Sequence, residues 1–197
     1  PMKGLKSHAL WFKITTTSVL FILPITVWLL YKPIRILAPG FNGMNCVSTS
    51  ICLQDTNRIN EARLLYDHAL AFVNSEVGEI RNKPRIIFCS TENCNQSFGF
   101  HAPAKAHTIG LSGIVIGPHG WDKYILRHEL IHHLQAERLG IIRQWRSPIW
   151  FKEGMAYSFS QDTRLTLTRP LLDYRAKFES WLDTVGEENL WQEASKL

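Results

Sequence analysis

The longest apolar stretch of the chain lies near its start. Residues 14–31 contain no charged side chain, and as a helix this run would rise about 27 Å, close to the thickness of a membrane hydrocarbon core. Trp28 and Tyr31 lie near its end, a position typical of a membrane interface. We therefore predict a transmembrane anchor at residues 14–31, preceded by a basic segment at residues 1–13. A cleaved signal peptide is the main alternative, and a buried soluble helix is disfavoured because the run has no amphipathic period.

The pattern changes after this apolar run. Residues 32–49 are rich in proline, glycine and polar side chains, which indicates a linker, and residues 50–197 are long enough for one domain with its own core. Apolar positions at helical spacing, together with proline and glycine at the ends, predict helices at residues 55–80, 121–139, 148–160, 170–185 and 187–197. Short apolar runs predict strands at residues 85–89, 108–111 and 113–117, and residues 162–169 form a threonine-rich loop or short strand. This order of elements indicates an α+β domain.

The charge of the chain excludes one class of partner. The formal net charge is +5, the basic residues are spread along the chain, and no nucleic-acid-binding motif is present. This distribution suits an anionic membrane surface better than DNA or RNA, so no nucleic-acid partner is expected.

The cysteines form two close pairs along the sequence. Cys46 lies near Cys52, and Cys89 lies near Cys94, without the C-x-x-C spacing of a zinc ribbon. Two local disulfides would fit an oxidising compartment and would place the domain on the extracytoplasmic side of the membrane. Four reduced thiols in a cytoplasmic protein are the alternative, and three pairings are possible for four cysteines.

The chemistry of the chain centres on the segment His128-Glu129-Leu130-Ile131-His132, inside the predicted helix 121–139. Residues four apart lie above one another on a helix face, so the two imidazoles can point at one metal ion. Neutral imidazoles are good zinc ligands. Glu129 is one step around the helix, where a carboxylate can act as general base on a water molecule.

A catalytic zinc ion usually has three protein ligands and one open position. Glu153 is the best candidate for the third ligand, because it lies on the next predicted helix between apolar neighbours, and a buried charge needs a partner. It belongs to the segment Trp150–Tyr157, which reads W-x-x-E-G-x-A. The two motifs together resemble the gluzincin branch of zinc metallopeptidases, and the resemblance covers roughly residues 114–160, less than a third of the chain.

The resemblance implies a fold and a set of roles. It implies a small zincin-like domain with a short mixed sheet packed on the helix that carries the motif. It implies that His128, His132 and Glu153 bind Zn²⁺ and that Glu129 is the catalytic base. It also implies that an extended peptide substrate pairs with an edge strand above this helix, formed by one of the strands within residues 99–118.

The sequence also departs from the family pattern. Tyr157 stands where thermolysin-like relatives have an aspartate that orients a ligand histidine, and the G-x-M-E-N type of site that binds the substrate amine in aminopeptidases is not evident upstream. The substrate class therefore does not carry over. A peptidase of this kind stabilises the oxyanion with a histidine or tyrosine. The candidates for that role are His101, His107, His119 and Tyr157.

Two functions fit these observations. The first is a single-pass membrane-anchored zinc peptidase with a peptide or protein substrate. The second is a non-catalytic, zinc-stabilised interaction or scaffold domain at the membrane surface, which would have a closed four-ligand site or a filled cleft. The sequence leaves the cleavage specificity and the oligomeric state open.

Overall fold

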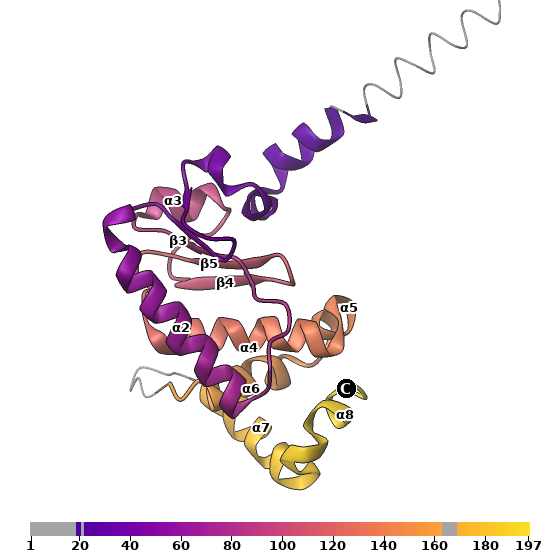
Figure 1. Ribbon diagram of the computed structural model, residues 1–197. Helices are drawn as coiled ribbons and strands as arrows, with labels where there is room; N and C mark the ends of the chain where they lie inside the picture. Colours follow the sequence, from indigo (N-terminus) through magenta and orange to yellow (C-terminus); the bar gives the residue numbers. More distant parts are fainter. Residues whose placement is uncertain (1–18, 21, 163–168) are drawn as a thin grey trace, which may run out of the picture.

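A five-stranded mixed sheet lies at the centre of the computed structural model, which describes residues 19–20, 22–162 and 169–197 (Figure 1). Its strands, in spatial order, are β1 (Asn45–Cys46), β2 (Ile51–Leu53), β3 (Ile86–Phe88), β5 (Gly113–Ile116) and β4 (Ala106–Ile109). Strands β2, β3 and β5 are parallel, whereas β1 and β4 pair antiparallel to their neighbours. Within the described chain, β4 therefore forms one edge of the sheet.

Side chains alternate between the two faces of the sheet, as strand geometry requires. Ile86 and Phe88 of β3 point into the main core, whereas Ile87 joins a smaller cluster on the opposite face. Helices α2 (Ile59–Glu76) and α4 (Lys123–Leu139) cover the first face, and α3 (Glu92–Ser97) lies on the second (Figure 1). The two faces are thus both buried, which explains why the central strands are apolar throughout.

Helix α4, which carries the two histidines, has well-defined ends. The Asp122 side chain accepts a hydrogen bond from the backbone N–H of Tyr124 at 2.7 Å and caps the first turn. Gly140 ends the helix with a φ of 81°, a backbone conformation that favours glycine. The chain then continues directly into the short helix α5 (Ile141–Arg146), which the sequence pattern did not predict.

A third layer of helices holds Glu153 beneath α4. It consists of α6 (Ile149–Phe159), α7 (Leu171–Val185) and α8 (Leu190–Ala194) (Figure 1). Helices α6 and α7 approach closely at Gly154, where an added Cβ would collide with the backbone oxygen of Tyr174. Phe151 and Phe178 fill the space between the two helices. This packing fixes the rotation of α6 and therefore the direction in which Glu153 points.

The N-terminal part of the fold also contains the 3₁₀ helices η1 (Lys32–Leu37), η2 (Pro39–Asn42) and η3 (Thr56–Arg58). Another 3₁₀ helix, η4 (Glu187–Asn189), lies near the C-terminus. Ile36 is fully buried in the smaller cluster, so residues 32–49, interpreted as a linker, contain packed structure as well as β1.

Two disulfides cross-link neighbouring elements of the fold. Cys46–Cys52 joins β1 to β2, and Cys89–Cys94 joins the end of β3 to α3. Together they form the local connectivity, one of the three connectivities that four cysteines allow.

The predicted transmembrane anchor is contradicted. No helix in the described part of the chain is long and apolar enough to cross a membrane. Helical residues 22–30 rise only about 14 Å, against a hydrocarbon core of about 30 Å. The fold prediction was wrong in this element, and the single-pass membrane location predicted from it is corrected with it. Residues 1–13, 14–18, 21 and 163–168, which fall in the predicted basic segment, anchor and threonine-rich loop, lie outside the described residues.

Candidate metal centre

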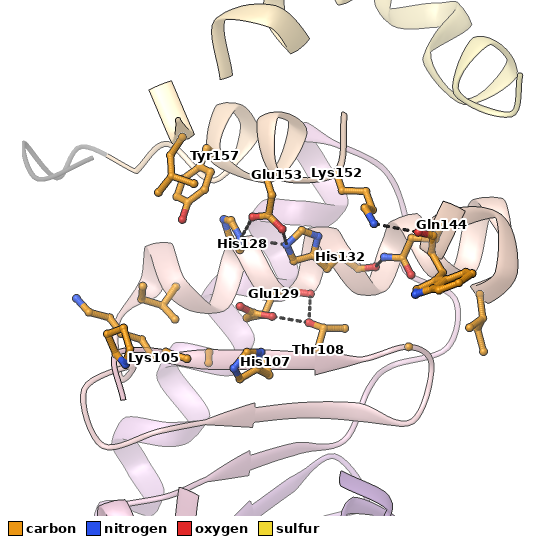
Figure 2. A pocket seen from close by; sticks show the side chains of 18 residues that line it. Lys105, His107, Thr108, His128, Glu129, His132, Gln144, Lys152, Glu153 and Tyr157 are labelled. Carbon is orange, nitrogen blue, oxygen red and sulfur yellow. Dashed lines mark hydrogen bonds and ion pairs between the residues drawn. The ribbon is translucent and has the colours of Figure 1, made fainter. Parts of the chain in front are cut away.

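Two adjacent helices bring together the three predicted metal ligands. His128 and His132 project from α4, and Glu153 projects from α6 toward them (Figure 2). The Nε2 atoms of the two histidines are 3.0 Å apart. His128 Nε2 lies 3.5 Å from Oε2 of Glu153, and His132 Nε2 lies 3.5 Å from the other carboxylate oxygen, Oε1. All three side chains are partly exposed, so the group faces a space that solvent or a ligand can enter.

These distances fit a tetrahedral zinc ion. Ligand atoms about 2.0–2.1 Å from a tetrahedral metal lie about 3.3 Å from one another. The observed separations of 3.0 and 3.5 Å bracket this value. Two imidazole nitrogens and one carboxylate oxygen also form a common donor set for catalytic zinc. The residues present therefore fit the metal.

A buried glutamine fixes the orientation of one ligand. The Nε2 amide of Gln135 donates to the backbone oxygen of Lys152 at 3.0 Å, so its Oε1 accepts from Nδ1–H of His132, also at 3.0 Å. With the proton on Nδ1, the lone pair of His132 Nε2 points toward His128 and Glu153. Such outer hydrogen bonds set the tautomer of metal-binding histidines.

The electrostatics of the group favour a positive charge at its centre. Burial lowers the pKa of His132, but the hydrogen bond to Glu153 and the charge of Glu129 outweigh burial and raise this pKa to about 9. Burial raises the pKa of Glu153, but hydrogen bonds to His128 and His132 outweigh it and hold this pKa well below the ordinary carboxyl value. A divalent cation between the three side chains would satisfy the same demand as a bound proton.

Glu129 points from α4 toward strand β4, whereas the two histidines point from α4 toward Glu153 (Figure 2). Glu129 is buried, and its Oε2 accepts a hydrogen bond of 2.7 Å from the Thr108 hydroxyl. The same hydroxyl lies 2.8 Å from the backbone oxygen of Glu129. Thr108 therefore ties the edge strand to the residue predicted as the catalytic base.

A cleft of about 800 Å³ runs past these groups. Its lining includes the three candidate ligands, Glu129 and β4 from Ala106 to Thr108. Figure 2 shows Lys105 and Gln144 at opposite ends of the cleft, with the histidines between them.

The four oxyanion candidates separate into two groups. His107 and Tyr157 line the cleft, and the ring of Tyr157 packs edge-on against His128 with centroids 4.5 Å apart. Burial lowers the pKa of His107, which favours its neutral form. His101 and His119 are exposed and do not line the cleft, and His119 lies 3.5 Å from Glu92 instead.

The sequence did not single out Thr108 or Gln135 as functional residues. Gln135 is three positions after His132 on the same helix, so the rule that such neighbours interact could have identified it. Thr108 had no such signal, because its contact depends on the long-range packing of β4 against α4.

Comparisons of this chain with family models, with curated proteins and with solved structures found no match. The assignment of function therefore rests on the chemistry of the site and on the two sequence motifs.

Proposed function

We propose that this protein is a zinc-dependent peptidase of gluzincin type. The observation that carries the proposal is the convergence of His128, His132 and Glu153 at zinc-ligand spacing, with Glu129 in the same cleft. A zinc ion held by these three residues would supply Lewis-acid chemistry, polarising a carbonyl group and lowering the pKa of water beside it to about 7.

Glu129 is the general base in this proposal. Its carboxylate takes a proton from the attacking water and passes it to the leaving amine, which is the proton transfer that amide hydrolysis requires. The hydrogen bond from Thr108 holds Oε2, which leaves Oε1 as the oxygen for the reacting water. Burial keeps competing solvent away from this carboxylate.

Strand β4 is the proposed site for the substrate backbone. It pairs with β5 on one side and forms the edge of the described sheet on the other, where it lines the cleft. A peptide in extended conformation can add to such an edge through backbone hydrogen bonds. The scissile bond would then lie between β4 and the histidines of α4.

Tyr157 or His107 would stabilise the oxyanion. The Tyr157 hydroxyl and a neutral His107 imidazole are both hydrogen-bond donors in the cleft. A donor aimed at the developing negative charge typically contributes about 10²–10³ in rate.

The scaffold alternative expects a fourth protein ligand or a filled cleft. In the described part of the chain, the metal-ligating group has three members, His128, His132 and Glu153, and the cleft beside it is open. Both observations support the catalytic proposal over the scaffold.

Metal content and hydrolysis test the proposal on the full chain. Elemental mass spectrometry should find about one zinc per chain, and a sharp loss in His128→Ala and Glu153→Ala variants. Glu129→Gln should keep the zinc and lose hydrolysis of a mixed peptide library. Hydrolysis by a zinc-loaded Glu129→Gln variant at the parent rate would contradict the mechanism, and a metal-free parent purified without chelators would contradict the site.

A further inference from the structure

Helix α5 presents an unusual amount of apolar surface. Its six residues, Ile141–Arg146, include none that is buried. Ile141, Ile142 and Trp145 are 53%, 68% and 75% exposed. Single exposed apolar residues are ordinary, but three on one short helix form a patch of the kind that marks a binding surface.

Hydrogen bonds fix helix α5 to its neighbours, although its apolar side chains are exposed. The Gln144 side chain donates to the backbone oxygen of His132 at 2.7 Å, and Lys152 Nζ donates to the backbone oxygen of Trp145 at 3.2 Å. At the other side, Ile141 lies over Gly110, next to the end of β4. The apolar side chains of α5 are thus fixed relative to a candidate ligand and to the edge strand.

Part of this surface belongs to the cleft. Ile141 and Trp145 line the same cleft as His128 and Glu129. They belong to the same short helix as Gln144, which Figure 2 shows at one end of the cleft. Ile142 lies outside the cleft and lines a second hollow, together with Leu139. A peptide that extends along β4 past the histidines would therefore meet Ile141 and Trp145.

The charged side chains that line the cleft affect which substrate side chains it can accept. Lys105 and Lys152 are the described basic side chains of its lining, apart from histidines. The described carboxylates are Glu129 and Glu153, which the proposed function already uses as base and ligand. No carboxylate of the described lining remains to pair with a basic substrate side chain, so the cleft disfavours substrates that carry lysine or arginine there.

We infer that Ile141 and Trp145 form a specificity site that selects a large apolar side chain close to the scissile bond. This inference rests on the proposed function, because it names the substrate class of the same cleft. An extended peptide presents alternate side chains to the same face, so one or two positions on one side of the scissile bond can reach α5. The preferred residues are Leu, Ile, Met, Phe and Trp.

A peptide library gives the first measurement. The zinc-loaded full chain is incubated with peptides from a whole-proteome digest made by cleavage after glutamate, which keeps internal lysine and arginine, and the new termini are identified by mass spectrometry. Large apolar residues should be enriched at one position within three residues of the cleaved bond, and lysine and arginine depleted there. Two synthetic peptides that differ only at this position, Leu against Ala, should then differ at least tenfold in kcat/KM, since a methylene in an apolar pocket typically gives about 10- to 200-fold.

Matched variants of α5 assign the preference to named side chains. Ile141→Ser and Trp145→Ser should each reduce the Leu-to-Ala ratio to about threefold or less, with zinc content and melting temperature unchanged. Ile142→Ser, which removes the same side chain from the neighbouring position outside the cleft, should leave the ratio intact. Isothermal titration of the Glu129→Gln variant with the two peptides should show the same difference in Kd, independent of turnover.

The outcomes separate the two proposals. Cleavage without an apolar preference, or a preference that Ile142→Ser reduces as much as Ile141→Ser, overturns the specificity site and leaves the peptidase standing. A zinc-loaded chain that cleaves none of the library overturns the peptidase and, with it, the specificity site.

Discussion

The hydroxyl group of Thr108 donates a hydrogen bond to Glu129, the proposed general base. The one proton of this hydroxyl is shared between the carboxylate oxygen Oε2 of Glu129 at 2.7 Å and the backbone oxygen of Glu129 at 2.8 Å, so the hydroxyl restrains the side chain and the helix turn that carries it. The bond also crosses from the strand proposed to bind substrate to the helix that carries the ligands. We therefore treat Thr108 as a positioning residue, which acts through Glu129 without contacting the metal.

Removing this hydroxyl should slow the chemical step. A hydrogen bond to a charged group contributes about 1.5–3 kcal/mol, so Thr108→Val should lower kcat about 10- to 100-fold. KM should stay within about threefold, because the substrate backbone contacts do not change. Thr108→Ser should restore most of the rate, and zinc content should be the same in all three proteins. A loss in KM alone would assign Thr108 to substrate binding instead.

The two oxyanion candidates in the cleft can be told apart by substitution. Tyr157 packs against His128 on the α6 side, whereas His107 lies on β4 (Figure 2). Tyr157→Phe keeps the ring and removes the donor, so it should lower kcat about 10²–10³ if the hydroxyl stabilises the transition state. His107→Leu, which removes the imidazole donor on β4, is the matched test of the other side. Equal and small effects from both variants would leave neither residue in this role.

Among the elements, α4 depends on its contact with the loop between α2 and β3. The Glu137 carboxylate accepts hydrogen bonds from the backbone N–H groups of Arg81 and Asn82 at 3.1 and 2.8 Å. Burial raises the pKa of Glu137, but these bonds outweigh it and lower the pKa below the ordinary value of 4.5. His133 adds a second contact, with Nε2 2.7 Å from the backbone oxygen of Asn82.

The Glu137 contact gives a pH-dependent prediction. A carboxyl whose pKa is lowered by folding stabilises the folded state above its unfolded pKa, and this stabilisation is lost as the pH falls through the folded pKa. Glu137→Gln should cost about 1 kcal/mol at pH 7, since the site is half-exposed, or about 2–4 °C in Tm. The difference from the parent should shrink below pH 4.5. Glu187→Gln, at an exposed position, should show no such difference, and a gap that persists at low pH would contradict this origin.

How far the elements could be predicted depended on whether their signals were local. The end of α4 followed from Gly140, which acts within one helical turn. Which strand forms the edge could not be predicted, because β5 inserts between β3 and β4 only in the folded sheet. Helix α5 could not be predicted because its six residues are too few to show a helical period of apolar positions. The membrane helix was wrong: among the described residues, no helix combines the length and the apolar content that crossing a membrane requires.

For the candidate site, the sequence supplied residue types and helical spacing but not convergence. Spacing on one helix was enough to pair His128 with His132. The approach of Glu153 depends on the close packing of α6 on α7 at Gly154, a tertiary contact. The hydrogen bond from Thr108 depends on the packing of β4 against α4, and the one from Gln135 to Lys152 depends on the packing of α6 against α4. Both are contacts between elements that only the structure reveals.

At the scale of the whole molecule, a zinc ion would join two layers that otherwise meet through apolar packing and through the hydrogen bond from Gln135 to the backbone oxygen of Lys152. His128 and His132 belong to the helix on the sheet, and Glu153 belongs to the helical layer beneath it. Binding to the folded state stabilises it by about 4 kcal/mol at a thousandfold excess over Kd, which corresponds to about 8–16 °C in Tm for a chain of this length. Calorimetry with both disulfides intact should therefore show a Tm increase near 10 °C when zinc is added to chelator-treated protein. Magnesium should give little change, because it prefers octahedral oxygen ligands. The His128→Ala variant should lose the zinc response, because it lacks one of the three proposed ligands. An equal response in that variant would show that the stabilising ion binds elsewhere.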